Sequence, residues 1–173
     1  MWGPVVGYLY DVFEAGRDVG DYCQSGEVVS EQDVIEEFRA YDWPAASLGV
    51  LPSGGEVLVN GETLFFAAGV RGPQEHAVDL GGLRVRLVAT PVAFGFDFGD
   101  GGRARSVSPG SDGDPVAAHR YVSKGEYAAS VEVTYAGQYW VDGEGPFPLP
   151  GAHTVAGPAV TLTALEARPV LVH

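Results

Sequence analysis

Four aspartates in a glycine- and serine-rich stretch are the residues whose type and spacing come nearest to a reactive site. They are Asp97, Asp100, Asp112 and Asp114. Carboxylate oxygens are the ligands that Ca²⁺ prefers, so a calcium site is one interpretation of this stretch. The spacing lacks the alternation of an EF-hand, however, and turn aspartates commonly accept hydrogen bonds from backbone amides instead. We therefore expect no resident cofactor, and calcium remains the alternative.

Other catalytic patterns have little support in the sequence. The histidines (His76, His119, His153 and His173) form no His-x-His or His-Glu-x-x-His motif, and Cys23 is the only cysteine, so zinc ligation is not predicted. There is no Gly-x-Ser-x-Gly motif, and the run Gly99 to Gly102 lacks the Lys-Ser/Thr of a phosphate-binding loop. We expect a protein that is not an enzyme.

Composition limits the classes of partner. The formal net charge is −13, with 10 Lys+Arg against 23 Asp+Glu. Such a surface repels phosphate backbones, so we expect no nucleic acid binding. No run of apolar residues is long enough to span a membrane. The first residues do not have the pattern of a signal peptide, but Cys23 and Met1 leave the compartment and the native start open.

Aromatic residues are the other candidates for a binding surface. Tyr139, Trp140 and Phe147 lie in one predicted hairpin, and Trp43 follows a predicted helix. Aromatics at the edge of a sheet can stack on sugars or anchor a protein partner. More often such residues pack against the sheet, and we favour that interpretation.

The elements that would position these residues change along the chain. Residues 1–29 are a poorly defined arm with a weak helical pattern that includes Phe13, and we expect it to pack on the sheet or on another subunit. A helix is predicted to begin at Ser30, because Ser30 and Asp33 have the spacing of a capping box. Its apolar face comprises Val34, Ile35, Phe38 and Tyr41. The helix and a linker occupy residues 30–47, and we expect the helix to cover an open edge or end of a sheet.

From Leu48 onward the apolar period becomes two, which is typical of strands. Asn60-Gly61 and Asp142-Gly143 each predict a two-residue hairpin turn. Prolines after Gly143 place the second arm of that hairpin at a sheet edge. Arg84 and Arg86 are expected to point outward, and residues 99–118 to form a long solvated loop. About eight to ten short strands therefore predict an antiparallel β-sandwich over residues 48–173.

Three sequence blocks within this region occur in a characteristic order. They are Phe94-Gly95-Phe96-Asp97-Phe98-Gly99-Asp100-Gly101, His119-Arg120-Tyr121, and Gly125-Glu126-Tyr127 followed by alternating apolar residues. This order resembles the signature of PKD (polycystic kidney disease) domains, although Phe96 stands where that family usually has Trp. The resemblance implies an immunoglobulin-like fold, and it assigns structural roles to Phe96, Asp97, Phe98, Gly99, Asp100, Gly101, His119, Tyr121, Gly125 and Tyr127.

The resemblance also carries an expectation of function. The chain looks like small actinobacterial proteins that contain a PKD domain, most of which are exported or belong to the cell envelope. It implies a non-enzymatic, extracellular or cell-envelope module that binds a protein or a glycan, with a cytoplasmic location as the alternative. The alternative function is a structural subunit of a surface assembly or filament, in which the N-terminal arm or an edge strand makes homo-oligomeric contacts.

Overall fold

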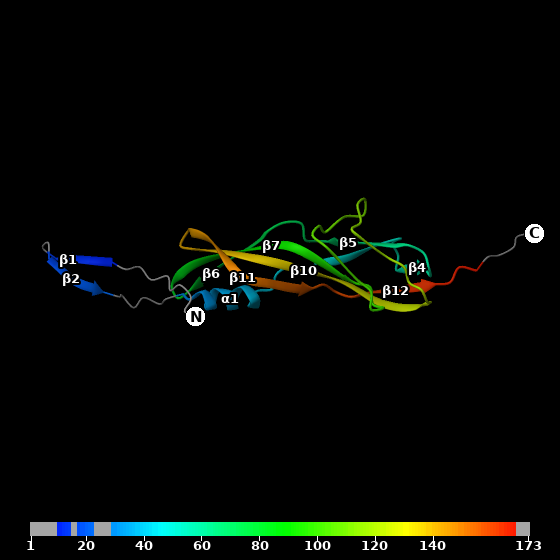
Figure 1. The fold of residues 1–173 in the computed structure, drawn as a ribbon, viewed down its shortest axis with the longest axis horizontal. Coiled ribbons are helices and arrows are strands. Elements are labelled where there is room, and N and C mark those ends of the chain that lie inside the picture. The colour runs from blue at the N-terminus through cyan, green and yellow to red at the C-terminus, as the bar shows by residue number, and fades with distance from the viewer. Residues whose placement is uncertain (1–9, 15–16, 23–28, 169–173) are drawn as a thin grey trace, which may run out of the picture. The chain divides into compact units, whose positions relative to one another are not determined.

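The structure is a computed structural model that describes residues 10–14, 17–22 and 29–168. Strands predominate, with one short helix, and none of the helical residues described forms a segment long and apolar enough to cross a membrane (Figure 1). The chain divides into two compact units. The first comprises Met1–Asp42, Glu75–Val88 and Gly137–Pro150, and the second comprises Trp43–Gln74, Ala89–Ala136 and Gly151–His173.

Three long strands contribute residues to both units: β7 (Leu83–Asp97), β10 (Gly125–Val141) and β11 (Glu144–Ala156). The other strands are short. They are β1 (Tyr10–Glu14), β2 (Arg17–Tyr22), β3 (Ser47–Leu51), β4 (Glu56–Leu58), β5 (Thr63–Ala68), β6 (Gln74–Leu80), β8 (Arg103–Ser106), β9 (Ala117–His119) and β12 (Val160–Leu165).

The first unit contains the helix α1 (Glu31–Ala40), which begins where the sequence predicts. Ser30 and Asp33 form the expected capping box, in which the Asp33 N–H donates to Ser30 Oγ and the Ser30 N–H donates to Asp33 Oδ2. Val34 and Phe38 are the buried residues of its apolar face. A Cβ added at Gly137 would lie 2.9 Å from the Phe38 ring, so Phe38 rests directly on β10. Since β10 has neighbours on both sides, this contact lies on a face of the sheet and not along an open edge.

The strands of this unit are joined by two-residue turns. Asp142 and Gly143 both have positive φ (48° and 88°) and connect β10 to its partner β11, which confirms the predicted hairpin. Among the described residues β11 pairs only with β10, as expected for a strand that contains Pro146 and Pro148. Arg84 and Arg86 of β7 are exposed, as predicted from their alternation with buried neighbours.

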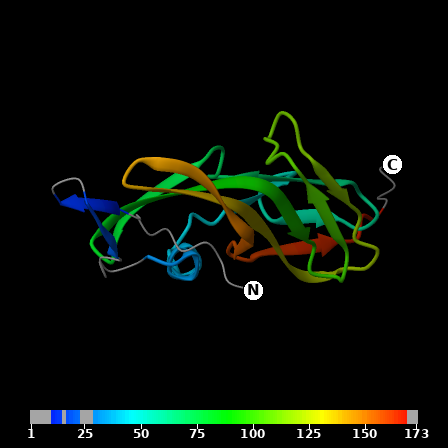
Figure 2. The same ribbon diagram turned by 60° about the vertical axis from the view of Figure 1, so that its left-hand side comes forward.

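The second unit has two sheets that pack on each other. In one, β12 pairs antiparallel with β10, and β8 pairs antiparallel with β7. The other has the order β3-β5-β9. Phe65 of β5 contacts Phe98, just after β7, with ring centroids 4.8 Å apart, so these aromatic side chains lie between the layers. Figure 2 shows the strands of the chain from a second direction. This arrangement is consistent with a β-sandwich.

Three predictions about the strands need correction. Asn60-Gly61 does not close a hairpin, because β4 and β5 belong to different sheets; Asn60 has φ 60°, and the Gly61 N–H donates to the Leu58 oxygen. The turn signal is local and carries no information about which strand each arm will pair with. The sandwich is also not wholly antiparallel, since β4 pairs with β12 in parallel. The expected long loop at 99–118 contains β8 and most of β9.

The N-terminal arm is described only in part. Its strands β1 and β2 pair antiparallel, with Tyr10 opposite Tyr22. Phe13 therefore lies in a strand, and the helical interpretation of this position was wrong. The remainder of the arm, including Cys23, and the last five residues lie outside the described residues.

Candidate functional site

The Asp97–Gly101 turn is held by its own aspartates. Asp97 Oδ1 accepts a hydrogen bond from the Gly99 N–H at 2.9 Å, and Asp100 Oδ1 accepts one from the Gly102 N–H at 2.9 Å. The Phe98 N–H donates to the Gly102 oxygen. Both carboxylates thus accept backbone amides, as expected for aspartates in tight turns.

Two separate features of the structure require glycine at position 99. Its φ is +83°, a region that L side chains rarely adopt. An added Cβ would also lie 2.6 Å from the backbone oxygen of Ala128 on β10. Gly101 has φ +94° but faces open space, so only the first reason applies there.

His119 and Tyr121 attach the turn to the rest of the second unit. His119 stacks on Phe98, with centroids 4.3 Å apart and rings 9° from parallel, while its Nε2 lies 2.7 Å from Asp100 Oδ2. Tyr121 is fully buried (0 % exposed), and its hydroxyl donates to the Phe98 oxygen at 2.9 Å. Tyr127 stacks on Tyr121 and donates to the Ser123 oxygen. Residues from all three sequence blocks are therefore brought into one cluster.

The electrostatics of the cluster follow from burial and hydrogen bonding. Burial raises the pKa of Tyr121 to about 12, and the negative charge of Asp100 acts in the same direction. At Asp100 partial burial acts to raise the pKa, but hydrogen bonds from His119 and from the Gly102 N–H outweigh it and hold the pKa below its usual value.

The four aspartates considered for calcium are not gathered. Asp112 Oδ1 accepts from the Gly113 N–H at 2.9 Å, and the Asp114 N–H donates to Ser111 Oγ. Within the described part of the chain, no group of three or more His, Cys, Asp or Glu side chains has a geometry that could hold a metal ion. Asp97 and Asp100 instead make the turn contacts given above.

The candidate binding aromatics have different surroundings. Trp43 is buried (1 % exposed), and its ring lies 6.3 Å from that of Tyr135, so its prediction as a surface anchor was wrong. Tyr139 is also buried (7 %) and packs against the half-buried Phe147. Trp140 is half-buried, and the Arg86 guanidinium lies over its ring at 4.1 Å. Trp140 is therefore the only one of the four that combines a partly open ring with a charged neighbour.

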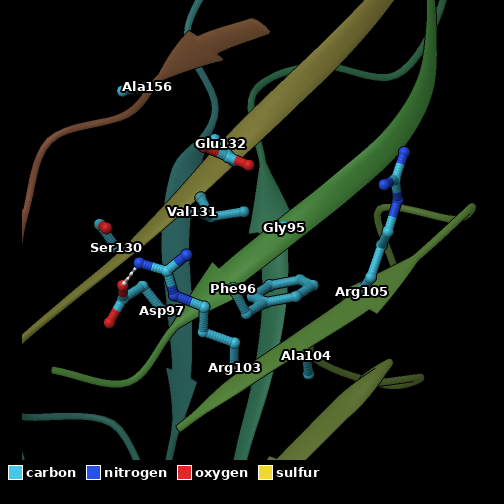
Figure 3. A pocket seen from close by; sticks show the side chains of 10 residues that line it. All are labelled: Gly95, Phe96, Asp97, Arg103, Ala104, Arg105, Ser130, Val131, Glu132 and Ala156. Atoms are coloured by element: carbon cyan, nitrogen blue, oxygen red, sulfur yellow. Dashed lines mark ion pairs between the residues drawn. The ribbon is translucent and has the colours of Figure 1, made fainter. Parts of the chain in front are cut away.

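A groove on the second unit, which the sequence did not indicate, has the shape of a binding site. It has a volume of about 420 Å³, and its walls come from β7, β8 and β10 (Figure 3). The Glu132 side chain lies over Gly95, since an added Cβ at Gly95 would meet Glu132 Oε1 at 2.9 Å. The other lining residues are Phe96, Asp97, Arg103, Ala104, Arg105, Ser130, Val131, Glu132 and Ala156.

Charged side chains of both signs surround this groove. Arg103 makes an ion pair with Asp97 at 3.1 Å, as the dashed line in Figure 3 shows. The Arg105 side chain extends from β8 away from that pair, and the Glu132 carboxylate comes from β10 (Figure 3). Within the described ranges neither Arg105 nor Glu132 takes part in an ion pair. The groove therefore offers both hydrogen-bond donors and acceptors to a polar ligand.

Sequence reasoning missed the groove because its residues come from four separate segments. The alternation of Arg103 and Arg105 with small residues was the one available signal, since it places both arginines on one side of a short strand.

Comparison with family models, with curated proteins and with solved structures found no match.

Proposed function

We propose that this chain is a non-enzymatic binding module with an immunoglobulin-like, PKD-type sandwich, acting in a bacterial cell-envelope or secreted protein. Its partner is a protein or a glycan. The observation that carries the proposal is the groove around Gly95, a concave surface of mixed apolar and charged residues that offers hydrogen-bond donors and acceptors. The envelope location rests on the resemblance of the three sequence blocks to PKD domains.

The geometry of the motif cluster supports a structural role for its acids. Asp97 and Asp100 each accept a backbone amide, and Asp100 also contacts His119, the nearest residue with general-base chemistry. The His119 ring is stacked flat on Phe98, which fixes its orientation inside the cluster. In the groove, Arg105 and Glu132 make no ion pair within the described ranges, so both can contact a partner.

The test is a binding survey with a groove-filling variant. Purified protein would be applied to a glycan array and to fractionated envelope material, and each hit measured by calorimetry. Gly95→Phe places a ring in the groove and displaces the Glu132 side chain, whose Oε1 and Cγ lie 2.9 and 3.0 Å from the added Cβ, and far-ultraviolet circular dichroism checks that the variant folds. Val92→Phe, at an exposed position of the same strand outside the groove, is the matched control. We expect Gly95→Phe to lose binding at least tenfold while Val92→Phe does not; retention of all binding by Gly95→Phe, or no hit for either class of partner, would refute the proposal.

One observation favours a second candidate, a subunit of a surface assembly. Strand β4 ends one sheet, and its Leu58 (54 % exposed) lies opposite Leu165 (42 % exposed) of β12. Exposed apolar residues on an edge strand are suited to pairing with another chain. Leu58→Lys should then abolish self-association in sedimentation velocity, whereas Val107→Lys, at an apolar position that is 83 % exposed, should not. A wild-type protein that stays monomeric at high concentration rules this candidate out.

A further inference from the structure

A second hollow, in the first unit, lies where β7 meets the end of β10. It has a volume of about 530 Å³ and is lined by Arg84, Arg86, Trp140, Asp142 and Gly143. The Asp142 N–H donates to the Arg84 oxygen, and the Arg84 N–H donates to Asp142 Oδ1, both at 2.9 Å. Arg86 lies over Trp140. Residue numbers increase along β7 and decrease along the neighbouring segment, as in an antiparallel pair. Arg84 therefore faces Asp142, and Arg86 faces Trp140, as cross-strand neighbours.

The Arg86 guanidinium is oriented without using its hydrogen-bond donors. Its carbon lies 4.1 Å from the centre of the Trp140 ring, a cation–π distance. The ion pair of Arg86 with Glu75 is long, at 3.6 Å, and both side chains are about half exposed or more (46 % and 60 %), so it restrains Arg86 weakly. Stacking leaves the N–H groups at the edge of the guanidinium exposed, so a ligand carboxylate can replace the long contact with Glu75 and form two parallel hydrogen bonds.

The neighbouring groups complete a set of complementary donors and acceptors. Arg84 lies two residues from Arg86 on the same side of β7, roughly 7 Å away along the strand, and the described part of the chain holds no ion-pair partner for it. Asp142 uses Oδ1 to accept the Arg84 amide, which leaves Oδ2 available to accept from a hydroxyl. A ligand that fits this site carries one anionic group for the arginines and hydroxyls for Asp142.

We propose that this hollow binds a carboxylated sugar, that is, a uronic acid residue of an acidic glycan. The sugar carboxylate pairs with Arg86 and Arg84, and a ring hydroxyl donates to Asp142. An acidic peptide fits less well, because additional carboxylates would meet Asp142 and a chain whose net charge is −13. The inference rests on the proposed function, because it names one glycan class for a binding module and adds a second site to it.

The experiment is calorimetry at about 0.15 M salt, an ionic strength at which surface charges are screened beyond about 8 Å. The probes are a galacturonic acid trimer, the matched neutral galactose trimer and an aspartate-rich peptide. The test variant is Arg84→Gln/Arg86→Gln. Its matched control is Arg71→Gln/Lys124→Gln, which removes the same charge from two exposed positions that line neither this hollow nor the groove around Gly95. Far-ultraviolet circular dichroism of each protein confirms folding.

We expect the acidic trimer to bind the wild-type protein and the control, and to lose affinity about tenfold or more in the test variant. Tryptophan emission should change with the acidic trimer only, and this change should be lost in Trp140→Leu, which should also bind more weakly because Arg86 loses its support. Equal binding of the neutral trimer, tighter binding of the peptide, or equal losses in the two double variants would overturn the inference. If other glycans or proteins bind in a Gly95→Phe-sensitive way while the acidic trimer does not, the inference fails and the proposed function stands.

Discussion

The Tyr121 hydroxyl donates a 2.9 Å hydrogen bond to the Phe98 oxygen inside the core, and Tyr121→Phe removes this donor while keeping the ring. The variant leaves a buried carbonyl oxygen without that bond, which costs about 1 to 2 kcal/mol in the free energy of unfolding near pH 7. Tyr127→Phe is the matched control, because its hydroxyl also donates to a backbone oxygen at 2.9 Å but in an exposed setting. It should cost less than about 0.5 kcal/mol.

Measurements at alkaline pH give a second, independent test of how the Tyr121 hydroxyl affects stability. Burial raises the pKa of Tyr121 to about 12, against an ordinary value of about 10. Because the folded-state pKa is the higher one, the stabilising contribution is fully present below about pH 10 and is lost as the pH rises through about 12. This difference between the two pKa values corresponds to a loss of roughly 2 to 3 kcal/mol in the free energy of unfolding. The side chain is fully buried, so little of this is reduced by solvent screening.

Because of these two effects, the free energies of unfolding of the wild-type protein and Tyr121→Phe should cross when plotted against pH. Tyr121→Phe should be less stable than the wild-type protein at pH 7, and equally or more stable near pH 12. The measurement is urea denaturation followed by circular dichroism at intervals from pH 7 to 12. Other tyrosines titrate in both proteins, so the difference between them isolates Tyr121. A difference that stays constant over the whole range would refute the reasoning.

Three further predictions concern the turn and the helix, each measured by urea denaturation. Gly99→Ala should cost about 2 to 4 kcal/mol, because the new Cβ meets a backbone oxygen as well as an unfavourable φ, whereas Gly101→Ala should cost only about 1 kcal/mol; equal costs would contradict the packing argument. Ser30→Ala should lower stability by about 1 kcal/mol through loss of the capping box, and an unchanged midpoint would contradict that role. The pKa of Asp100 is lowered, so its contribution is present above about pH 4 and is lost as the pH falls through the folded-state value. The stability difference between the wild-type protein and Asp100→Asn should therefore shrink between pH 5 and pH 2, and a difference that does not depend on pH would mean that the bond to His119 is unimportant.

The features that sequence reasoning predicted correctly depend on neighbours within a few residues. Ser30 and Asp33 cap a helix because they are three residues apart. Asp97 accepts the Gly99 amide because the turn brings them together, and Asp142-Gly143 closes a hairpin for the same reason. Each of these contacts is formed by a short stretch of backbone whose conformation the local residue types largely decide.

The features that were missed depend on segments far apart in the chain. A strand has two edges, and nothing in residues 56–58 indicates that they pair with 163–165 rather than with the strand after Asn60. Trp43 is buried beside Tyr135, a residue far along the chain, and the sequence around Trp43 does not reveal that neighbour. The groove at Gly95 likewise exists only after β7, β8 and β10 have come together.

The parallel pairing of β4 with β12 has a consequence for how the chain is made. Leu58 and Leu165 lie roughly a hundred residues apart, so closing this contact carries a large loop entropy and gives the sheet a high contact order. During synthesis β4 emerges early and has to wait, unpaired, until residue 165 has left the ribosome. Throughout that interval Val57, which is almost completely buried in the finished protein, is exposed to solvent and to other nascent chains.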